Sequence, residues 1–517
     1  MKRRFVQFVA LLVALWAALS SGGVLAEPED ISAAARSVVR VVLVSEQGDE
    51  PGLVGHGSGF AVGPDLILTN AHVVQPAREI EEIRIGVVPS QGKNGWFARV
   101  VALSPRNDLA LLKLTEPGSL PPITLFTGPV ADGSEVFAVG YPGNVDLAQG
   151  LDVGDIVSPT SPVKTRGNVS AGRSSKQFET ILHNAAIGGG NSGGPLLDSC
   201  GRVIGANTFG TISDGSDSEF YFAVSTREIL RFLRAADVKA RSTGIACRSM
   251  EDLERAETER IANVQAETEE EARSAEAKQR EAEELAQREA LMAIIAERET
   301  GMVLAGIALL LSLVSGGAVL FFNDSDRPRE AKIAGGLAVL LLAGAVTTWL
   351  LRPSFSDVTN RADEFAGREE TEANPKPATV DLTGKFICAL NMARSRVTVS
   401  DPIDLELSWR EDGCADGSRQ FGIGADGWSQ VAVSDADSMV TVAHFDPPSG
   451  EYRTERYYPT LDVMTQLQAK LKEIKAPKCG AGEEAAAKLA EDQRALIALL
   501  PKTPSERMVY DCRNTED

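Results

Sequence analysis

Three short segments of the chain carry the groups that hydrolysis of a peptide bond by a serine hydroxyl requires. This chemistry needs a nucleophile, a base that takes its proton, a carboxylate that orients the base, and N–H donors for the oxyanion. His72, in residues 69–74, offers the base, and Asp108 offers the carboxylate at the start of an apolar segment. Ser192 offers the nucleophile in the glycine-rich residues 188–195, where backbone N–H groups can turn toward a substrate carbonyl.

The order of these residues along the chain separates two kinds of serine hydrolase. Taken singly, a histidine beside an apolar strand is usually packed, and an aspartate before a strand is usually a turn residue. Residues 190–194 also fit the G-x-S-x-G turn of α/β-hydrolases, which carry their histidine after the serine. The only later histidine is His444, beyond two long apolar runs. The order His72, Asp108, Ser192 is instead that of chymotrypsin.

Residues 30–233 carry the signals of many short strands that could hold these groups. Residues 59–62 and 66–69 flank a Gly-Pro-Asp turn and predict a hairpin. Many short strands joined by glycine and proline turns predict a sandwich or a barrel. Residues 225–235 have the apolar spacing of a helix, with Thr226 as a candidate N-cap, and are expected to close the domain.

The three segments resemble the trypsin-like peptidases, and within them the HtrA (Deg) branch. That branch has the motifs T-N-x-H-V-V, D-x-A-L-L-K and G-N-S-G-G-P, which occur here at residues 69–74, 108–113 and 190–195. The resemblance covers about residues 30–235. It implies an all-β, chymotrypsin-like double β-barrel protease domain at residues 27–247.

The resemblance also implies a role for each matched residue. His72 is the expected general base and acid, Asp108 orients it, and Ser192 is the nucleophile. The backbone N–H groups of Gly190 and Ser192 form the expected oxyanion hole. Asn191 stands where digestive trypsin-like enzymes have an aspartate that pairs with a newly cut N-terminus, so that route of activation is not expected.

By the same resemblance, the pocket for the substrate side chain is lined by the segment before the nucleophile loop and by the strand after it. The pocket residues are Ala186, Ile187, Thr208 and Phe209, with Ala185 beside them. None of them is a carboxylate, and burial of an unpaired Arg or Lys there would be costly. Cleavage after an apolar residue is therefore expected.

Several features depart from the HtrA pattern. No segment resembles the PDZ domain that usually follows the protease in that branch, so trimeric assembly and PDZ-gated regulation are not carried over, and the oligomeric state stays open. Asn184 stands where the branch has an aspartate. His183 is a candidate for the rim of the pocket, although a packed strand histidine is the simpler interpretation. His56, in a glycine-rich loop, has no expected catalytic role.

Residues 1–26 have the pattern of a secretory signal peptide. Lys2, Arg3 and Arg4 precede an apolar stretch, and residues 24–26 supply a small-residue cleavage site. The alternative is an uncleaved membrane anchor. In both cases the segment that follows is exported.

A charged segment and two apolar runs follow the protease domain. Residues 250–300 hold sixteen acidic and seven basic side chains and no glycine or proline, which predicts one long solvated helix. The runs 302–322 and 333–351 are each long enough to span about 30 Å of hydrocarbon. They predict a transmembrane hairpin with a short cytoplasmic loop at 323–332, the alternative being a buried pair of core helices. Residues 352–380 are a polar linker.

Residues 381–517 are expected to form a small α+β domain. Its expected elements are three strand-like pieces, around Phe386, Val397 and Val440, and two helical stretches, at 461–474 and 483–500.

The six cysteines include no C-x-x-C pair, so they predict disulfides in an exported chain rather than a zinc or redox site. They are Cys200, Cys247, Cys388, Cys414, Cys479 and Cys512. The first two are expected to pair. The other four allow three connectivities, of which we prefer Cys388 with Cys414 and Cys479 with Cys512, because the last two flank a predicted helix. A cytoplasmic domain with four reduced thiols is the alternative.

Together these features predict a location and a function. Arg327, Arg329 and Lys332 favour a cytoplasmic loop, so that the protease and C-terminal domains face the periplasm or exterior of a bacterial-type inner membrane. A net charge of −20 argues against nucleic acid as a partner, and no cofactor or metal is expected. The expected function is a membrane-anchored serine endopeptidase that hydrolyses exported or misfolded proteins through an acyl-enzyme. The alternatives are a sensor or scaffold whose C-terminal domain binds a partner, and an esterase.

Overall fold

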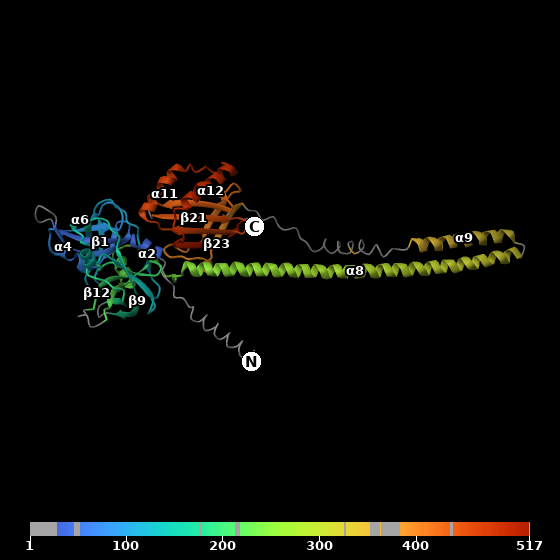
Figure 1. Ribbon diagram of the computed structural model, residues 1–517, viewed down its shortest axis with the longest axis horizontal. Coiled ribbons are helices and arrows are strands. Elements are labelled where there is room, and N and C mark those ends of the chain that lie inside the picture. Colours follow the sequence, from blue (N-terminus) through green and yellow to red (C-terminus); the bar gives the residue numbers. More distant parts are fainter. Residues whose placement is uncertain are drawn as a thin grey trace, which may run out of the picture. The chain divides into compact units, whose positions relative to one another are not determined.

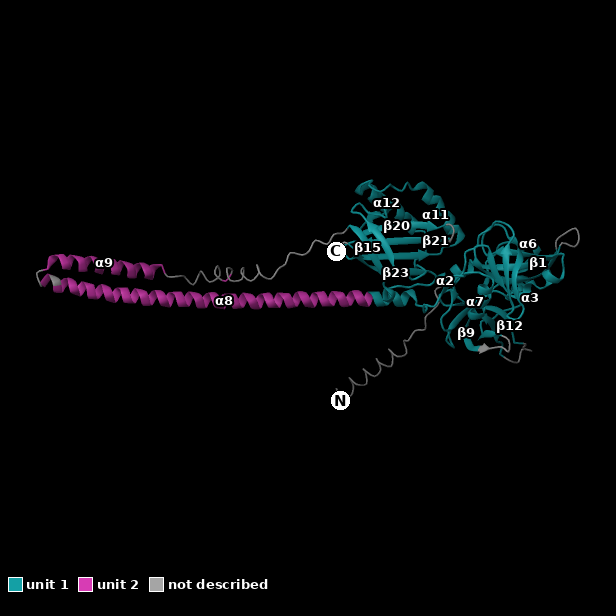
Figure 2. Cartoon of the chain, turned by 180° about the vertical axis from the view of Figure 1, so that it is seen from behind, with its two compact units in different colours: residues 1–257, 380–517 teal, residues 258–379 magenta. Residues whose placement is uncertain are grey.

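The computed structural model describes residues 28–45, 52–174, 178–211, 218–324, 327–351, 362, 383–425, 427–434 and 438–515 (Figure 1). Contacts divide the chain into two compact units, residues 1–257 with 380–517, and residues 258–379 (Figure 2). The expected signal peptide lies outside the described residues, and so does the expected linker apart from Ala362.

Six antiparallel strands close into a first barrel in the order β1, β2, β3, β6, β5, β4. They are β1 (Val38–Ser45), β2 (Gly52–Gly63), β3 (Leu66–Thr69), β4 (Ile83–Pro89), β5 (Trp96–Ser104) and β6 (Leu109–Leu114). The predicted hairpin is formed by β2 and β3. Val39, Val41 and Leu43 alternate along β1 into one apolar core, because successive side chains of a strand face opposite sides. This core fixes the ends of β3 and β6, which lead into the site.

A second group of six strands closes in the order β11, β8, β9, β10, β13, β12, because β11 also pairs with β12. They are β8 (Glu135–Gly140), β9 (Val163–Ser174), β10 (Glu179–His183), β11 (Pro195–Asp198), β12 (Val203–Gly210) and β13 (Tyr221–Ser225). Two short strands, β7 (Leu125–Phe126) and β14 (Ser242–Thr243), extend the sheet beyond β12. The two barrels confirm the predicted double-barrel architecture.

Short helices connect and close the barrels. They are α2 (Pro28–Ala35), α3 (Ala71–Val74), α4 (Pro76–Glu79), α5 (Gly143–Gln149), α6 (Val153–Ile156) and α7 (Thr226–Ala235). As predicted, α7 closes the domain, and it buries Ile229 and Leu233 in the barrel core. Its N-cap is Ser225 and not Thr226, since the Ser225 hydroxyl accepts from the backbone N–H of Glu228.

A disulfide joins Cys200, in the turn after β11, to Cys247, the pair that the sequence predicts. The two cysteines are 47 residues apart. Closing a loop of that length removes enough entropy from the unfolded chain to stabilise the fold by about 4 kcal/mol. The bond ties the segment after α7 to the turn after β11, the strand that follows the glycine-rich loop at residues 188–194.

The C-terminal domain is built on one nine-stranded sheet in the order β18, β17, β16, β15, β23, β22, β21, β20, β19. Its strands are β15 (Gly384–Leu390), β16 (Leu405–Trp409), β17 (Cys414–Ala415), β18 (Arg419–Gln420), β19 (Gly422–Gly424), β20 (Gly427–Ser434), β21 (Met439–Asp446), β22 (Glu451–Tyr457) and β23 (Glu506–Asn514). Two helices, α11 (Leu461–Glu473) and α12 (Glu483–Ile497), pack Met464, Leu467 and Leu496 into an apolar cluster with β21. No strand forms at Val397, which follows the single turn η2 (Met392–Arg394).

The preferred pairing of the four C-terminal cysteines is wrong. The structure joins Cys388 to Cys512 and Cys414 to Cys479. Cys388 and Cys512 lie directly opposite each other on β15 and β23, because the last strand of the chain returns beside the first strand of this domain. Spacing along the sequence does not reveal such a long-range register, whereas the helix between the last two cysteines suggested a local pair.

The double-barrel and C-terminal domains belong to the same compact unit and share buried polar contacts. Arg396 and Asp30, both with 2% of the side chain exposed, form an ion pair, and Arg396 also donates to the carbonyl of Arg248 at 2.6 Å. Arg36 donates to the carbonyls of Ser438 and Pro459, each at 3.0 Å. These hydrogen bonds and this ion pair join the two domains directly.

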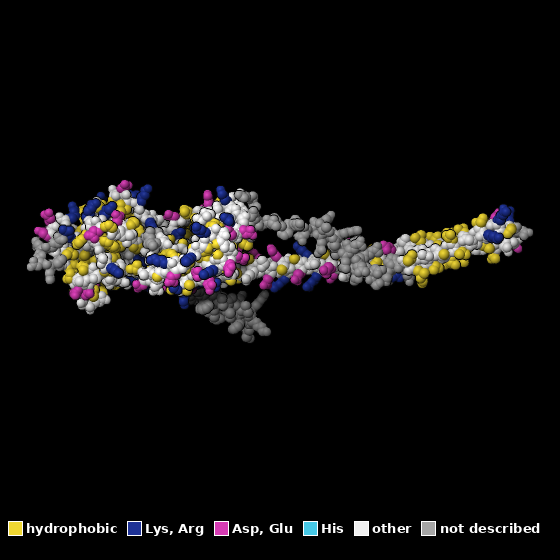
Figure 3. Space-filling view, turned by 90° about the horizontal axis from the view of Figure 1, so that it is seen from above, with side chains coloured by type: hydrophobic (Ala, Val, Ile, Leu, Met, Phe, Trp, Pro, Cys, Tyr) yellow, Lys and Arg dark blue, Asp and Glu magenta, His cyan; other side chains and the backbone are white. Residues whose placement is uncertain are grey.

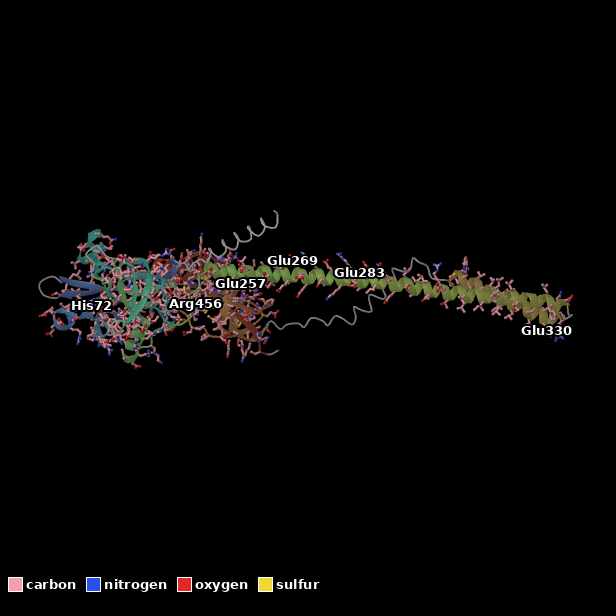
Figure 4. The ribbon with its side chains drawn as sticks, turned by 90° about the horizontal axis from the view of Figure 1, so that it is seen from below. His72, Glu257, Glu269, Glu283, Glu330 and Arg456 are labelled. Carbon is pink, nitrogen blue, oxygen red and sulfur yellow. A yellow bond between two sulfur atoms is a disulfide. The ribbon has the colours of Figure 1, made fainter. Side chains whose placement is uncertain are left out.

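The acidic segment and the first apolar run form one continuous helix, α8 (Met250–Asp324), of 75 residues. At 1.5 Å per residue it is about 110 Å long. Glu269 and Glu283 are exposed on its charged part (Figure 4). The next helix is α9 (Pro328–Leu350), and hydrophobic side chains cover the apolar part of both helices (Figure 3). By length and composition α8 and α9 could each cross a membrane. Only 6% and 11% of their most apolar 18-residue stretches are buried inside the protein.

Candidate active site

His72 and Asp108 come from the ends of two neighbouring strands of the first barrel. His72, labelled in Figure 4, lies in α3 directly after β3, and Asp108 immediately precedes β6, which pairs with β3. Asn70, at the N-cap of α3, donates from Nδ2 to the carbonyl oxygen of Asp108 at 2.8 Å. Asp108 has a φ of 52°, a left-handed conformation that aspartate tolerates better than most residues. This local geometry turns the Asp108 carboxylate toward His72.

The Asp108 carboxylate is held by His72 and Thr208. Nδ1 of His72 lies 2.8 Å from Oδ2 and 3.0 Å from Oδ1, and the backbone N–H of His72 donates to Oδ1 at 3.0 Å. The Thr208 hydroxyl donates to Oδ2 at 2.5 Å. Burial alone would raise the pKa of Asp108, but the hydrogen bonds from His72 and Thr208 outweigh burial and hold the pKa below its ordinary value. An ionised Asp108 favours the tautomer of His72 that carries its proton on Nδ1, which leaves a lone pair on Nε2.

The loop before Asp108 is fastened to the helix that closes the domain. Asn107 donates from Nδ2 to Glu228 on α7 at 2.9 Å. Glu228 is 7% exposed, accepts from the backbone N–H of Glu179 at 3.2 Å, and pairs with Arg231 at 2.7 Å. A carboxylate of the second barrel region therefore positions the segment of the first barrel that carries Asp108.

Ser192 lies in a loop that needs glycine at two positions. Gly190 has a φ of 102° and Gly193 a φ of 86°, values at which a side chain would be strained. A Cβ on Gly193 would also lie 2.3 Å from the carbonyl oxygen of Ser58. In this loop the N–H of Gly193 donates to the carbonyl of Asn207 at 2.8 Å, and the N–H of Ser58 donates to the carbonyl of Ser192 at 2.9 Å. The glycines thus let the loop lie directly on strands of both barrels.

The two expected oxyanion donors differ from their neighbours in the loop. The N–H groups of Gly190 and Ser192 make no hydrogen bond to any residue that the structure describes, whereas the N–H of Asn191 donates to the carbonyl of Gly188 at 3.0 Å. Two N–H groups without internal acceptors suit an oxygen that develops negative charge on a substrate.

Thr208 links the nucleophile to the carboxylate. The Ser192 hydroxyl donates to the carbonyl oxygen of Thr208 at 3.1 Å, and the Thr208 hydroxyl donates to Asp108. From the sequence, Thr208 is expected only to line the pocket. Thr208 is 5% exposed, and nothing in the strand pattern indicates that its hydroxyl donates to Asp108.

The other expected pocket residues are partly open to solvent. Ala186 is exposed and Ile187 is half-buried, while Ala185 beside them is fully buried. Phe209 is 44% exposed and stacks on Phe222 with ring centroids 4.7 Å apart. Ala186, Ile187 and Phe209 are therefore apolar and open to solvent, whereas Ala185 and Thr208 are buried.

The sequence misses Tyr221 and Glu219 beside this pocket. The Tyr221 hydroxyl donates to Glu219 at 2.6 Å. The hydrogen bond to Glu219, followed by burial, raises the pKa of Tyr221, while a contact with the backbone of Ile187 acts in the opposite direction. This contact brings the pair next to one of the expected pocket residues.

The two remaining histidines of the protease domain are both packed. His183 is fully buried, with its ring centroid 5.9 Å from that of Tyr221, and burial lowers its pKa to about 4. It is therefore neutral at pH 7 and does not form the rim of the pocket. Nε2 of His56 lies 3.0 Å from the carbonyl oxygen of Tyr141.

Comparison with known proteins agrees with this geometry. Residues 57–205 match the family model described as a trypsin-like peptidase domain. The chain is 35% identical to serine protease HTRA1B of Danio rerio over 185 residues, which are 35% of this chain and 34% of that protein. It is 34% identical to the mitochondrial serine protease HTRA2 of Bos taurus over 195 residues, 37% of this chain and 39% of that protein.

A plant relative gives a similar match. Protease Do-like 5, chloroplastic, of Arabidopsis thaliana is 33% identical over 188 residues, 34% of this chain and 55% of that protein. The chain thus spans between about a third and just over half of the length of these relatives. The chain is therefore similar to the trypsin-like peptidases and to the HtrA serine proteases, and the acidic helix, the apolar helices and the C-terminal domain lie outside residues 57–205, which match the family model.

Replacing Thr208 by valine removes the hydroxyl that donates to Asp108 and keeps the shape of the side chain. We expect Thr208→Val to lower the free energy of unfolding by about 1–3 kcal/mol at pH 7, as for loss of a hydrogen bond to a charged group. Because the pKa of folded Asp108 is depressed, this contribution is present above the ordinary aspartate pKa of about 3.9 and is lost as pH falls through the lower folded value. The difference from wild type should therefore shrink at pH 3.

Urea unfolding of the full chain in detergent, read by pulse proteolysis of barrel peptides at pH 7 and pH 3, measures this difference. Thr208→Ser keeps the hydroxyl and is the matched control. An equal loss of stability at both pH values, or the same loss in Thr208→Ser, would contradict the assignment.

Proposed function

We propose that this chain, which carries a trypsin-like peptidase domain similar to those of the HtrA serine proteases, is a membrane-anchored serine endopeptidase that cleaves exported or misfolded proteins. The observation that carries the proposal is the hydrogen-bonded set of His72, Asp108 and Thr208 next to Ser192, on a loop with two unoccupied N–H donors in the part that the structure describes.

In the proposed reaction Nε2 of His72 takes the hydroxyl proton of Ser192 while Oγ attacks the carbonyl carbon of the scissile peptide bond. The carbonyl electron pair moves onto oxygen, which accepts hydrogen bonds from the N–H groups of Gly190 and Ser192. Collapse of this intermediate breaks the C–N bond, and His72 gives its proton to the leaving amine. The acyl group then remains on Ser192.

A water molecule completes the proposed cycle. His72 takes one proton from the water as its oxygen attacks the acyl carbon, and the C–O bond to Ser192 breaks as His72 returns the proton to Oγ. Asp108 stays ionised throughout and stabilises the imidazolium form of His72. Its depressed pKa supports this role.

Catalysis should depend on all three residues of the proposed triad. Ser192→Ala, His72→Ala and Asp108→Asn should each lower kcat by roughly 10³-fold or more, because the three side chains act as a unit. The measurements are hydrolysis of a denatured protein substrate by purified full chain, and labelling of Ser192 with a fluorophosphonate. Hydrolysis that survives Ser192→Ala refutes the triad, and a folded wild type that neither labels nor hydrolyses would favour the sensor or scaffold.

We further propose that cleavage follows an apolar residue. Ala186, Ile187 and Phe209 bring no charge, and Glu219 is engaged with the Tyr221 hydroxyl. Mass spectrometry of the fragments of a peptide library should find apolar residues at the acyl side of the cut, with an unchanged profile in Glu219→Gln. A profile dominated by Arg or Lys would refute the apolar pocket, and its loss in Glu219→Gln would identify the carboxylate that binds them.

We also propose that the apolar end of α8 and α9 form a transmembrane hairpin, with the protease and C-terminal domains outside. The Ser312 hydroxyl on α8 donates to the carbonyl of Ala338 on α9 at 2.8 Å, the kind of polar contact that holds helices together in hydrocarbon. Arg327 and Arg329 lie between the two apolar runs and suit a cytoplasmic loop. The three disulfides suit an oxidising compartment for both domains.

Reporter fusions measure this topology. Alkaline phosphatase, which is active only outside, should be active after residue 517 and inactive when the chain is truncated after Arg329. A fluorescent protein that matures only inside should give the reverse pattern at the two positions. Phosphatase activity at both positions, or at neither, contradicts the hairpin.

A further inference from the structure

The nucleophile loop is held on its back by the strand β2 and by the segment between β8 and α5. The Ser58 hydroxyl donates to the carbonyl of Gly190 at 2.7 Å and accepts from the N–H of Tyr141 at 3.0 Å. The N–H of Gly143 donates to the carbonyl of Gly189 at 2.8 Å. Since the peptide groups on either side of Gly190 are fixed by their carbonyl oxygens, these bonds determine where its N–H points.

His56 lies on β2 two residues before Ser58, so its side chain projects from the same face of the strand. Its Nε2 is 3.0 Å from the carbonyl oxygen of Tyr141. A Cβ on Gly190 would lie 2.8 Å from this nitrogen and 2.3 Å from that oxygen. The imidazole and the Tyr141 carbonyl therefore form the surface on which the backbone of Gly190 rests.

A buried ion pair lies next to His56. Asp146 on α5 has an oxygen 3.4 Å from Nε2 of His56, and its other oxygen accepts from Arg40 at 2.8 Å. Arg40 also donates to the carbonyl of Ile156 at 3.1 Å, and its guanidinium lies 4.7 Å from the centroid of the Tyr141 ring. The side chains of His56, Asp146 and Arg40 are 13%, 9% and 2% exposed.

The protonation state of His56 follows from these neighbours. A carbonyl oxygen only accepts, so the contact with Tyr141 assigns a proton to Nε2. Burial lowers the pKa of His56 below its ordinary value, and Arg40 lowers it further, while the Tyr141 carbonyl and Asp146 act in the opposite direction. The ring is thus neutral at pH 7, with Nε2–H as its donor.

From this geometry we propose that His56 is a positioning residue for the oxyanion hole: its Nε2–H holds the Tyr141 carbonyl, and the pair supports Gly190 so that its N–H faces the substrate. His56 does not touch the reacting atoms. Asp146 lies close to its ring, and Arg40 holds Asp146 in place. The proposal rests on the proposed peptidase function and adds a residue to which the sequence gives no role in catalysis.

A matched pair of variants tests the proposal. His56→Gln keeps an N–H donor at about the reach of Nε2, and His56→Met has a similar length and no donor. Removal of an oxyanion donor in other enzymes lowers kcat by about 10²–10³-fold, so a displaced donor should cost about 10- to 100-fold. We expect this loss in kcat for His56→Met with KM within about twofold, and kcat within about threefold of wild type for His56→Gln.

The second readout is the affinity of a peptide boronate, whose tetrahedral adduct occupies the oxyanion hole, measured on full chain in detergent together with the thermal unfolding midpoint. Boronate affinity should fall in His56→Met by about the same factor as kcat, at an unchanged midpoint. A kcat equal to wild type, a loss confined to KM, or an equal loss in His56→Gln overturns the proposal. If His56→Met does not fold, a folded and active His56→Gln still supports it, and failure of both to fold rejects it.

Different variants test the proposed peptidase function and the proposed role of His56. Hydrolysis that persists in Ser192→Ala rejects the proposed function. Hydrolysis that is lost in Ser192→Ala and unchanged in His56→Met rejects only the role of His56.

Discussion

The structure of the site depends on keeping one partly buried carboxylate ionised. The side chain of Asp108 is 19% exposed, and its charge is stable there only because N–H and O–H groups surround it. The donors come from different parts of the fold: His72 follows a strand of the first barrel and Thr208 lies on a strand of the second. The register of β12 must therefore be fixed, because a shift of this strand by one residue would turn the Thr208 side chain away from the carboxylate.

In the glycine-rich loop that carries Ser192, the acceptors rather than the donors are satisfied inside the protein. Its carbonyl oxygens accept from Ser58 and Gly143 on the side facing the barrels, and its two N–H groups at Gly190 and Ser192 are left for the opposite side. Satisfying one set of polar groups inside the protein leaves the complementary set for a ligand. The positive φ of Gly190 gives its peptide this orientation. The loop conformation therefore requires both the glycine and the hydrogen bonds to its carbonyl oxygens.

The sequence predicts the parts of this arrangement that are local. The β-branched and apolar runs and the turn at residues 63–65 predict a sandwich or a barrel, and the resemblance of the three motifs to trypsin-like peptidases predicts the double barrel. What the sequence does not predict depends on contacts between distant strands. The partner of the Thr208 hydroxyl is evident only once the fold brings Thr208 of one barrel to Asp108 of the other. A histidine in a glycine-rich loop likewise gives no sign that it supports another loop.

The disulfide pairing of the C-terminal domain also depends on contacts between distant strands, and the contacts of this domain bear on the membrane topology. Its cysteine pairing follows from the return of β23 beside β15, which no spacing rule contains. The ion pair of Arg396 with Asp30 joins residues on opposite sides of α8 and α9 in the sequence, within one compact unit. Two domains that share a buried ion pair must occupy one compartment, and a chain that crosses a bilayer between them can return to that compartment only by an even number of spans. The contact thus supports a two-span hairpin independently of the charges in the loop and of the disulfides.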